Sequence, residues 1–533
     1  MSIRQTANSV MLQRESNTVL KAGVGKVDIT CAEGALAYGL YPEKTMAHIP
    51  PQYRDMKVQI DDPLFVRALV LDNGSEKVVL VTLDICAIGA RTISQYILND
   101  SADDFMPNLR RRVEQELNIP GCNVSVSASH THPPGRLLCD DEEQVARTIG
   151  AIQQALGNMA PVTIGVGAGH ESTLTINRTM IMKNGTDYSW QPEPPGDEIE
   201  KLRPIDPKIG ILRIDRLDGR PLAVVYDFAS HLLVGCRKGK VTADFPGVTS
   251  RYLEENLGGD VTAIFLQGAN GDIMEAAYDD CENPRNKYDF GYRLGRSVLK
   301  AYRTITTGPA TIKVVTRQVE FPLRKDIPEA VAAVKREQAE LTASTRYTGL
   351  NFKTFLPLYL KYSLHPDYPS HSPHRYMQAD NCGDDTFRTL DEQNRGAVKK
   401  YLESIRTMEL MAINELKIAT LEKHQEIITE LGGATVPAEI KGIRIGECAL
   451  IAAPMEILAE IGFKVKKRSP FKHTYIVSNS NGYLHYSPPA SYYGRGGYEV
   501  TECLLAPEWE KMFEEVVAEI FKELRSIGGQ TKR

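Results

Sequence analysis

The sequence predicts an α/β fold with a mixed β-sheet, flanking helices and a helical insertion. Short β-branched apolar runs alternate with amphipathic helical stretches, which is the pattern of α/β proteins. The runs are unevenly spaced and some follow one another directly, so some neighbouring strands must pair antiparallel. A charged helical stretch at about 325–430 separates the last strands from the earlier ones. We therefore expect a loose N-terminal arm at 1–20 and one domain at 21–533 that this insertion interrupts.

The composition is that of a soluble globular protein. The chain has 533 residues, of which 42% are hydrophobic and 25% charged, enough for a large core. A net charge of -5 and a pI near 6.2 give no electrostatic reason to expect nucleic acid or an anionic membrane as a partner. The N-terminus is polar, and no window reaches the roughly 20 apolar residues of a membrane span, so we expect a cytoplasmic protein without stable membrane insertion.

Most predicted strands lie in the first half of the chain. They are apolar and rich in β-branched residues, and they cover 22–30, 65–71, 78–85, 123–127, 162–167, 209–215, 222–231 and 261–267. The turn Asp72-Asn-Gly-Ser75 predicts a hairpin between the second and third of them. Apolar side chains at helical spacing predict helices at 108–117, 145–156 and 248–256. The Pro-rich, charged stretch 185–207 is predicted to be a surface loop.

The second half begins with the insertion. Helices are predicted at 327–341 and 392–422, with a loop rich in Tyr, Pro and His at 347–376 between them. Strands return at 439–445, 449–453 and 474–478. Proline suits the first turn of a helix, so we expect a helix to start at Pro454, and a final amphipathic helix covers 507–524. The nine cysteines are scattered without a Cys-x-x-Cys motif, which predicts reduced thiols.

Polar residues suited to metal binding end several predicted strands. His130 and His132 follow the run 123–127, and alternation along a strand points both to one face. His231 ends another strand, and Glu456 follows a third. Two imidazoles and one carboxylate are a common zinc set, although a lone His-x-His more often reflects loop polarity and Glu456 could simply favour a helix N-terminus. Carboxylates at further strand ends could orient the imidazoles or cap loops, namely Asp84, Asp244 and Asp272.

From about 21 to 500 the sequence resembles the neutral (non-lysosomal) ceramidases, with a gap over the insertion. Short motifs carry the resemblance because they occur in the family's order and at similar spacing. They are Gly23-Val-Gly-Lys-Val-Asp-Ile-Thr30, Ser129-His-Thr-His132, Asn177-Arg-Thr179, Phe228-Ala-Ser-His231, Pro454-Met-Glu456, Ser480-Asn-Gly-Tyr-Leu-His-Tyr486 and Tyr498-Glu499.

The resemblance implies a zinc-dependent hydrolase that cleaves an amide, or an ester, of a small-molecule substrate by metal-activated water. It implies as zinc ligands His130, His231, Glu456 and Tyr486. A phenol can be a ligand because a divalent cation lowers its pKa. It also implies that the substrate amide is bound and its carbonyl polarised by His132, Arg178 and Tyr498.

Departures from the family favour a substrate other than ceramide. Met274 stands where the family has an active-site serine, which excludes a mechanism through that serine, and Pro133-Pro-Gly-Arg136 replaces Ser-Gly-Pro-Gly. The signal peptide and C-terminal β-sandwich domain of the secreted members are not expected here.

Two alternatives to this function remain open. One is a non-catalytic or repurposed protein that binds a metal or ligand, and the other is a hydrolase of a glycosidic or lactone linkage, with the loop 347–376 lining its pocket.

Overall fold

A computed structural model describes residues 19–36, 55–89, 104–132, 141–189, 194, 196–235, 240–258, 260–276 and 286–526. The predicted arm up to residue 18 and the segment Pro133-Pro-Gly-Arg136 lie outside these residues. The chain divides into two compact units, which we call the main unit (1–189, 196–324 and 431–533) and the inserted unit (190–195 and 325–430).

The main unit is built on an eight-stranded sheet with the order β14-β12-β11-β6-β1-β3-β4-β5. Its strands are β1 (Lys21–Asp28), β3 (Phe65–Asp72), β4 (Lys77–Leu83), β5 (Val124–Ala128), β6 (Ala160–His170), β11 (Lys208–Arg216), β12 (Pro221–Phe228) and β14 (Thr262–Gln267). The pairs β4–β5 and β12–β14 are parallel, and the other neighbours are antiparallel. The predicted mixed sheet in an α/β fold is therefore confirmed, including the hairpin between β3 and β4.

A four-stranded sheet packs against one face of the eight-stranded sheet. Its order is β16-β17-β18-β20, with β16 (Ile312–Pro322), β17 (Thr435–Ile445), β18 (Cys448–Ala452) and β20 (His473–Val477). The shared core includes Leu69 and Leu212 of the larger sheet and Leu450 and Tyr475 of the smaller one. Each strand alternates its side chains, so the opposite face of the larger sheet is left for helices.

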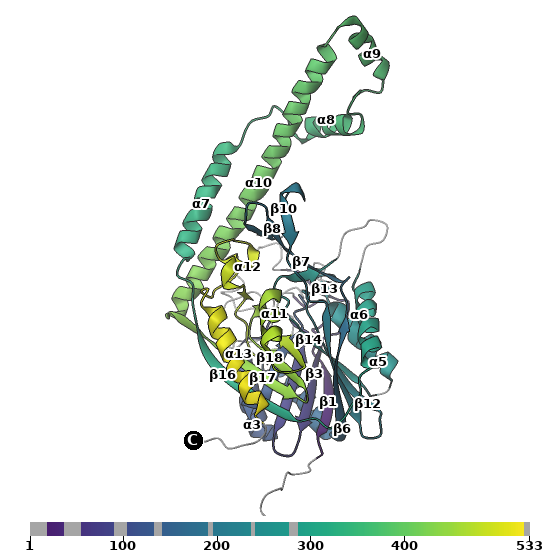
Figure 1. Ribbon diagram of the computed structural model, residues 1–533, viewed down its shortest axis with the longest axis vertical. Helices are drawn as coiled ribbons and strands as arrows, with labels where there is room; N and C mark the ends of the chain where they lie inside the picture. Colours follow the sequence, from purple (N-terminus) through teal and green to yellow (C-terminus); the bar gives the residue numbers. More distant parts are fainter. Residues whose placement is uncertain are drawn as a thin grey trace, which may run out of the picture. The chain divides into compact units, whose positions relative to one another are not determined.

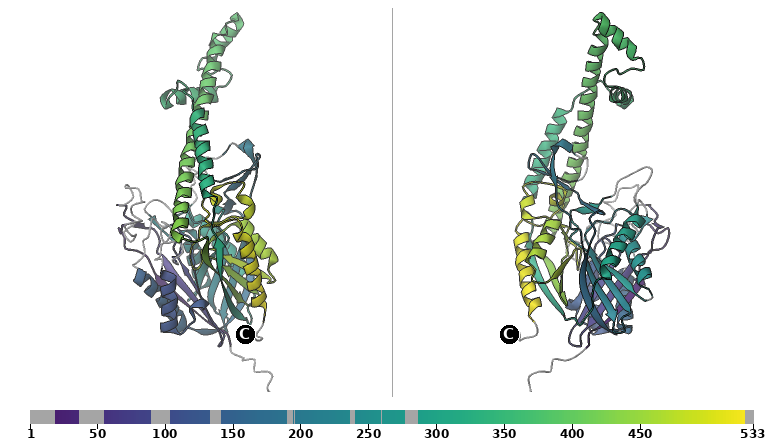
Figure 2. Two further views of the ribbon diagram at one scale, coloured as in Figure 1. Left: turned by 90° about the vertical axis from the view of Figure 1, so that its left-hand side faces the viewer. Right: turned by 45° about the vertical axis from the view of Figure 1, so that its right-hand side comes forward.

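Helices cover the outer faces of both sheets (Figures 1 and 2). The larger sheet packs against α3 (Phe105–Leu117), α4 (Asp141–Gly157), α5 (Asp244–Leu257) and α6 (Lys287–Tyr302). The smaller sheet packs against α11 (Ala459–Arg468) and α13 (Trp509–Arg525). The main unit thus has four layers in the order helix, sheet, sheet, helix. A Cβ added to Gly442 would lie 2.1 Å from Cγ2 of Ile520, so a glycine is needed for α13 to approach β17 this closely.

Three local predictions are wrong. The stretch 185–207 is not only loop, because β9 (Asp187–Ser189) and β10 (Ile199–Leu202) flank β8 (Thr179–Met182) in a small sheet. The loop expected at 347–376 contains α8 (Phe352–Leu364) and part of α9 (Pro373–Cys382), since the Asn351–Thr354 capping box starts α8 despite Pro357 inside it. No helix starts at Pro454, because the backbone of Glu456 pairs as β19 (Glu456–Ile457) and donates to the His485 carbonyl.

The inserted unit consists of α7 (Ile327–Ser344), α8, α9 and the 46-residue α10, which runs Thr386–Leu431. Phe355 of α8 stacks on Tyr401 of α10 with ring centroids 4.6 Å apart. The hydroxyls of Tyr362 and Tyr376 donate to opposite oxygens of Asp391, at 2.9 and 2.8 Å. These contacts fix α8 and α9 onto the long helix. Among the described residues, no helix has the length and apolar character needed to cross a membrane.

Candidate metal centre

The two histidine-bearing strand ends are fastened to each other by a glutamine. His130 follows the end of β5, and His231 follows the end of β12. Gln267, the last residue of β14, donates from Nε2 to the carbonyl oxygens of Ser129 at 3.0 Å and Ser230 at 2.8 Å. The residue before each histidine is therefore held by one side chain. Gln267 was not predicted as a site residue, and its only signal in the sequence is its position at the end of an apolar strand.

Glu456 and Tyr486 reach the same place through a short parallel pairing. β19 pairs with β21 (Tyr486–Ser487), and Glu456 lies opposite Tyr486 in the register. The chain at Gly271 packs closely on this ladder, because a Cβ there would lie 2.6 Å from the carbonyl oxygen of Glu456. The segment that follows β14 therefore packs against the backbone that carries Glu456.

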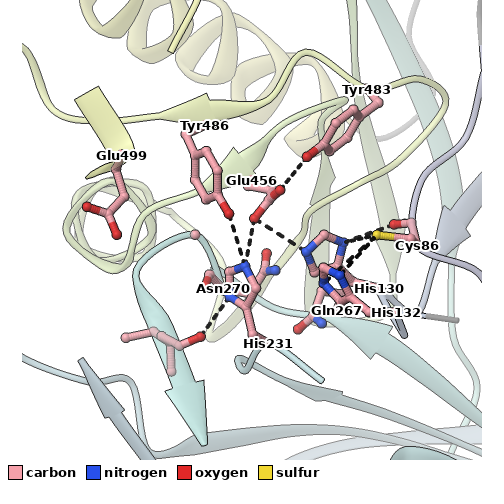
Figure 3. A network of polar contacts seen from close by, with 12 residues as sticks. Cys86, His130, His132, His231, Gln267, Asn270, Glu456, Tyr483, Tyr486 and Glu499 are labelled. Atoms are coloured by element: carbon pink, nitrogen blue, oxygen red, sulfur yellow. Dashed lines mark hydrogen bonds and ion pairs between the residues drawn. The ribbon is translucent and has the colours of Figure 1, made fainter. Parts of the chain in front are cut away.

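The predicted ligands meet in one buried cluster (Figure 3). Oε2 of Glu456 lies 3.0 Å from Nε2 of His231 and 3.4 Å from Nε2 of His130. The hydroxyl of Tyr486 lies 3.2 Å from Nε2 of His231. His130 and Glu456 are 0% exposed, His231 is 2% and Tyr486 6% exposed. The structure thus brings together all the residues that the resemblance implied as ligands.

Backbone carbonyls fix the orientation of both imidazoles. Nδ1 of His130 lies 2.9 Å from the carbonyl oxygen of Cys86. Nδ1 of His231 lies 3.0 Å from that of Asn270 and 2.9 Å from that of Ile273. A carbonyl only accepts, so Nδ1 carries the proton in each ring, and in a neutral imidazole Nε2 is then a bare acceptor. Burial lowers the pKa of His231, and the nearby Arg178 guanidinium lowers it further.

The nitrogen and oxygen atoms of the cluster are suitable ligands for a divalent cation. Among the described residues, Nε2 of His130 and Oε2 of Glu456 are buried without a hydrogen-bond partner. Bare imidazole nitrogens that face a carboxylate oxygen repel it unless a cation lies between them. Two imidazoles, a carboxylate and a phenol are ligands that zinc accepts, so the residues fit the implied metal.

Arg178 is held in place beside the cluster. It lies between β7 (Thr175–Asn177) and β8, and its Nε donates to Oε1 of Glu499 at 2.7 Å while Nη2 donates to the Gly271 carbonyl at 2.8 Å. The side chains of Arg178 and Glu499 are 2% and 3% exposed. The guanidinium carbon lies 5.3 and 5.0 Å from the ring centres of Tyr486 and Tyr498. A buried, oriented positive charge therefore adjoins the candidate ligands. Glu499 was matched only as part of a motif, and its role was not predicted.

His132 and Tyr498 are less buried than the candidate ligands. The His132 ring lies 4.7 Å from that of His130 and 6.1 Å from that of His231. Burial and the neighbouring His130 and His231 hold the pKa of His132 well below its usual value, so its imidazole is neutral at pH 7. Tyr498 begins α12 (Tyr498–Thr501), and burial raises the pKa of its phenol, which stays protonated. These side chains border the cluster, as expected for residues that face a substrate.

The strand-end carboxylates do not orient the imidazoles. Asp84 pairs with Arg67 at 2.9 Å, Asp244 accepts from the N–H of Gly235 at 2.8 Å, and Asp272 accepts from the N–H of Ala459 at 2.8 Å. The possibility that they hold imidazole tautomers is therefore not supported among the described residues, where backbone carbonyls take that role. Asp244 and Asp272 accept backbone N–H groups, as the loop-capping alternative predicts, whereas Asp84 forms a buried ion pair.

A buried glutamate positions the loop after His231 and makes stability depend on pH. Oε1 of Glu275 accepts from the N–H groups of Leu233 and Val234, the latter at 2.9 Å. Burial and, to a smaller extent, the Asp244 carboxylate raise the pKa of Glu275 to about 8. This folded pKa lies above the value of about 4.3 for an unfolded glutamate. The resulting stabilisation is complete below about pH 4 and is lost as the pH rises through about 8.

We predict that the free energy of unfolding falls by up to about 1.4 kcal/mol per pH unit between about pH 5 and about pH 8 because of Glu275. In Glu275→Gln this part of the slope disappears, since the amide does not titrate. Denaturant unfolding of the wild type and the variant over this range measures the difference. Glu515→Gln on the exposed side of α13 is the control, and an identical slope in Glu275→Gln and wild type would contradict the prediction.

Comparison with known proteins places the main architecture in the class of ceramidase folds. The crystal structure of neutral ceramidase from Pseudomonas aeruginosa superposes with a TM-score of 0.60 at 16% identity, covering 97% of this chain and 77% of that one. A ceramidase complexed with C2 gives a TM-score of 0.58 at 15% identity, covering 96% of this chain and 78% of that one. No protein-family model and no curated protein matches the sequence. The predicted ceramidase-like fold is confirmed, and the roles of the site residues stay predictions.

Proposed function

We propose that this protein is a zinc-dependent hydrolase that cleaves an amide bond, or an ester bond, in a small molecule. The observation that carries the proposal is that Nε2 of His130 and Oε2 of Glu456 are buried without a hydrogen-bond partner, 3.4 Å from each other and beside Nε2 of His231. Such a set is costly in a folded protein unless it binds something. The ceramidase fold of the main unit supports the reaction class by analogy.

Under this proposal zinc would be held by His130, His231, Glu456 and Tyr486. Bound there, it would supply a Lewis acid that polarises a carbonyl and lowers the pKa of water toward neutrality. Arg178 is fixed by its ion pair with Glu499, so its guanidinium would stabilise negative charge that develops on the acyl oxygen without having to move.

The two bordering side chains would complete the reaction. The protonated phenol of Tyr498 would donate a hydrogen bond to the acyl oxygen. The neutral imidazole of His132 would accept a proton at a ring nitrogen from the attacking water and pass it to the leaving amine. His132 is partly exposed, which leaves room for a substrate beside it.

We further propose a substrate other than ceramide and a location in the cytoplasm. The strand β15 (Ile273–Glu275) carries the apolar, partly exposed Met274 where the ceramidases have a serine. The same residue motivates the second candidate, a protein that binds metal or ligand without catalysis. Turnover decides between the two.

Metal analysis of the purified protein tests the ligand set. We expect about one zinc ion per chain in the wild type and less than about a tenth of that in His130→Ala and in His231→Ala, because each removes one ligand. His170→Ala, at the exposed end of β6, is the matched control and keeps its zinc. Full zinc occupancy in both ligand variants would refute the assignment.

A panel of N-acyl amides and esters of differing acyl length then tests catalysis. We expect turnover that is lost when a chelator removes zinc and returns when zinc is added back. Zinc-loaded protein that turns over no member of the panel would favour the non-catalytic candidate.

A further inference from the structure

The inserted unit exposes an apolar face on one short helix. The side chains of this face lie on α8, and their exposed fractions are 64% for Phe352, 38% for Leu356, 41% for Tyr359, 47% for Leu360 and 70% for Leu364. Their spacing of four, seven, eight and twelve residues from the first places them along one side of the helix. We call these five residues the α8 face. Isolated exposed apolar residues are ordinary, but a contiguous stripe marks an interaction surface.

The α8 face belongs to a well-anchored helix. The Asn351–Thr354 capping box fixes its first turn. On the other side of the helix, Phe355 and Tyr362 are buried against α10, through the ring stack with Tyr401 and the hydrogen bond to Asp391. Figure 1 shows α8 alongside the long helix of its unit. A helix that is apolar on both sides is expected to be buried on both sides. The α8 face is exposed, so its composition indicates a binding partner.

Positive charge surrounds the α8 face. The stretch 346–366 contains Arg346, Lys353 and Lys361 and no aspartate or glutamate. At the C-terminal end of α8 a cavity of 470 Å³ is lined by Lys361, His365, His371 and Arg375. The one carboxylate that lines it, Asp391, accepts tyrosine hydroxyls on both oxygens and lies 3.5 Å from Nζ of Lys361. The cleft therefore offers the guanidinium of Arg375 and the partly exposed ammonium of Lys361 to an anionic group next to the apolar stripe.

We propose that the α8 face docks on the surface of a membrane that contains anionic phospholipids. A helix with an apolar face and flanking lysines lies in the plane of the lipid interface, with the apolar face at the boundary of the acyl chains. The lysines, arginines and cleft would bind lipid phosphates, and the tyrosines suit the interfacial region. The net charge of the whole chain, -5, conceals this local basic patch. The proposal goes beyond the hydrolase function and does not depend on it.

Charge disfavours a second copy of the chain as the occupant. In a symmetric dimer formed through the α8 face, the same patch lies on both partners. Arg346, Lys353 and Lys361 of one copy would then lie against the same basic stretch of the other copy, which has no carboxylate. An anionic lipid surface would attract the same positive charges.

Vesicle sedimentation with the full chain tests the docking. We expect binding to vesicles of phosphatidylcholine and phosphatidylglycerol, at least tenfold weaker binding to phosphatidylcholine alone, and loss of binding as salt is raised. Phe352→Ser/Leu360→Ser should weaken binding at least tenfold, because it removes apolar area from the face. The matched control Val19→Ser/Leu217→Ser changes two exposed apolar residues of the main unit, and its binding stays that of the wild type.

A variant without two of the lysines measures the electrostatic contribution to vesicle binding separately from the apolar contribution. Lys353→Gln/Lys361→Gln should weaken binding to the anionic vesicles several-fold and reduce its salt dependence, whereas Lys472→Gln/Lys511→Gln, on exposed lysines of the main unit, should not. Circular dichroism at the helical minimum checks that each variant keeps its fold. Binding that is equal on both kinds of vesicle, or unchanged in the serine variant, overturns the proposal. The proposal is also overturned if the wild type does not bind vesicles but forms a dimer in solution, and Phe352→Ser/Leu360→Ser is monomeric.

Discussion

Glu456→Gln is expected to lower the affinity of the protein for zinc by roughly a hundredfold or more, and to abolish hydrolysis with it, because even residues that merely support a ligand contribute 10–100-fold to metal affinity. The amide keeps the volume of the side chain but removes the charge that faces His130 and His231 at 3.4 and 3.0 Å. Competition with a chelator of known affinity measures the loss. Because Glu456 is 0% exposed, solvent does not replace the missing charge.

Two variants of neighbouring tyrosines act as graded controls for Glu456→Gln. Tyr483 donates its hydroxyl to Oε1 of Glu456 at 2.5 Å, so Tyr483→Phe should weaken zinc binding about tenfold by freeing the carboxylate. Tyr486→Phe removes a neutral phenol, whose pKa burial raises well above its usual value, and should weaken binding less than the loss of the carboxylate. Zinc affinity that is the same in Glu456→Gln and in wild type would show that the cluster is not the metal site.

Local sequence was sufficient for the strands of the main unit but not for the partition into two sheets. β3 and β4 have apolar residues with a turn signal between them, so their pairing could be read from neighbouring residues. β16 and β17 are separated by the whole inserted unit, and their register depends on residues more than a hundred positions apart. α8 was not predicted because Pro357 and the surrounding tyrosines favour a loop. The capping box at Asn351 and Thr354 favours a helix, but its hydrogen bonds to backbone N–H groups exist only in the folded chain.

The candidate site was predictable where a strand end places a residue and unpredictable where a distant backbone atom completes it. His130 and His231 follow strands, so the apolar runs located them, but β5 ends at Ala128 and His130 has a φ of 69°, so the expected strand alternation does not extend to His130 and His132. The carbonyl oxygens of Cys86, Asn270 and Ile273, which orient the two rings, belong to other segments and have no side-chain signature. The partnership of Arg178 with Glu499 joins residues 321 positions apart.

Arg178→Met is expected to damage both activity and stability. Removal of one preorganised donor to a developing oxyanion costs about 10²–10³ in turnover, which is the loss we expect under the proposed function. The variant also leaves the carboxylate of Glu499 buried without its cation, since the side chains are 2% and 3% exposed. Breaking a buried pair in this way costs about 3–5 kcal/mol. Thermal unfolding and steady-state kinetics measure the two effects.

The compensated variant Arg178→Met/Glu499→Gln separates the two roles of the arginine. The amide of the second substitution can still accept the hydroxyls of Thr179 and Ser189, which lie 3.2 and 2.9 Å from Oε2 of Glu499. Replacing both members of a buried ion pair is often close to neutral, so most of the lost stability should return. Turnover should not return, because the guanidinium that would stabilise the acyl oxygen is still missing. Recovery of turnover together with stability would mean that Arg178 serves only to hold Glu499, and that the oxyanion is stabilised by other groups.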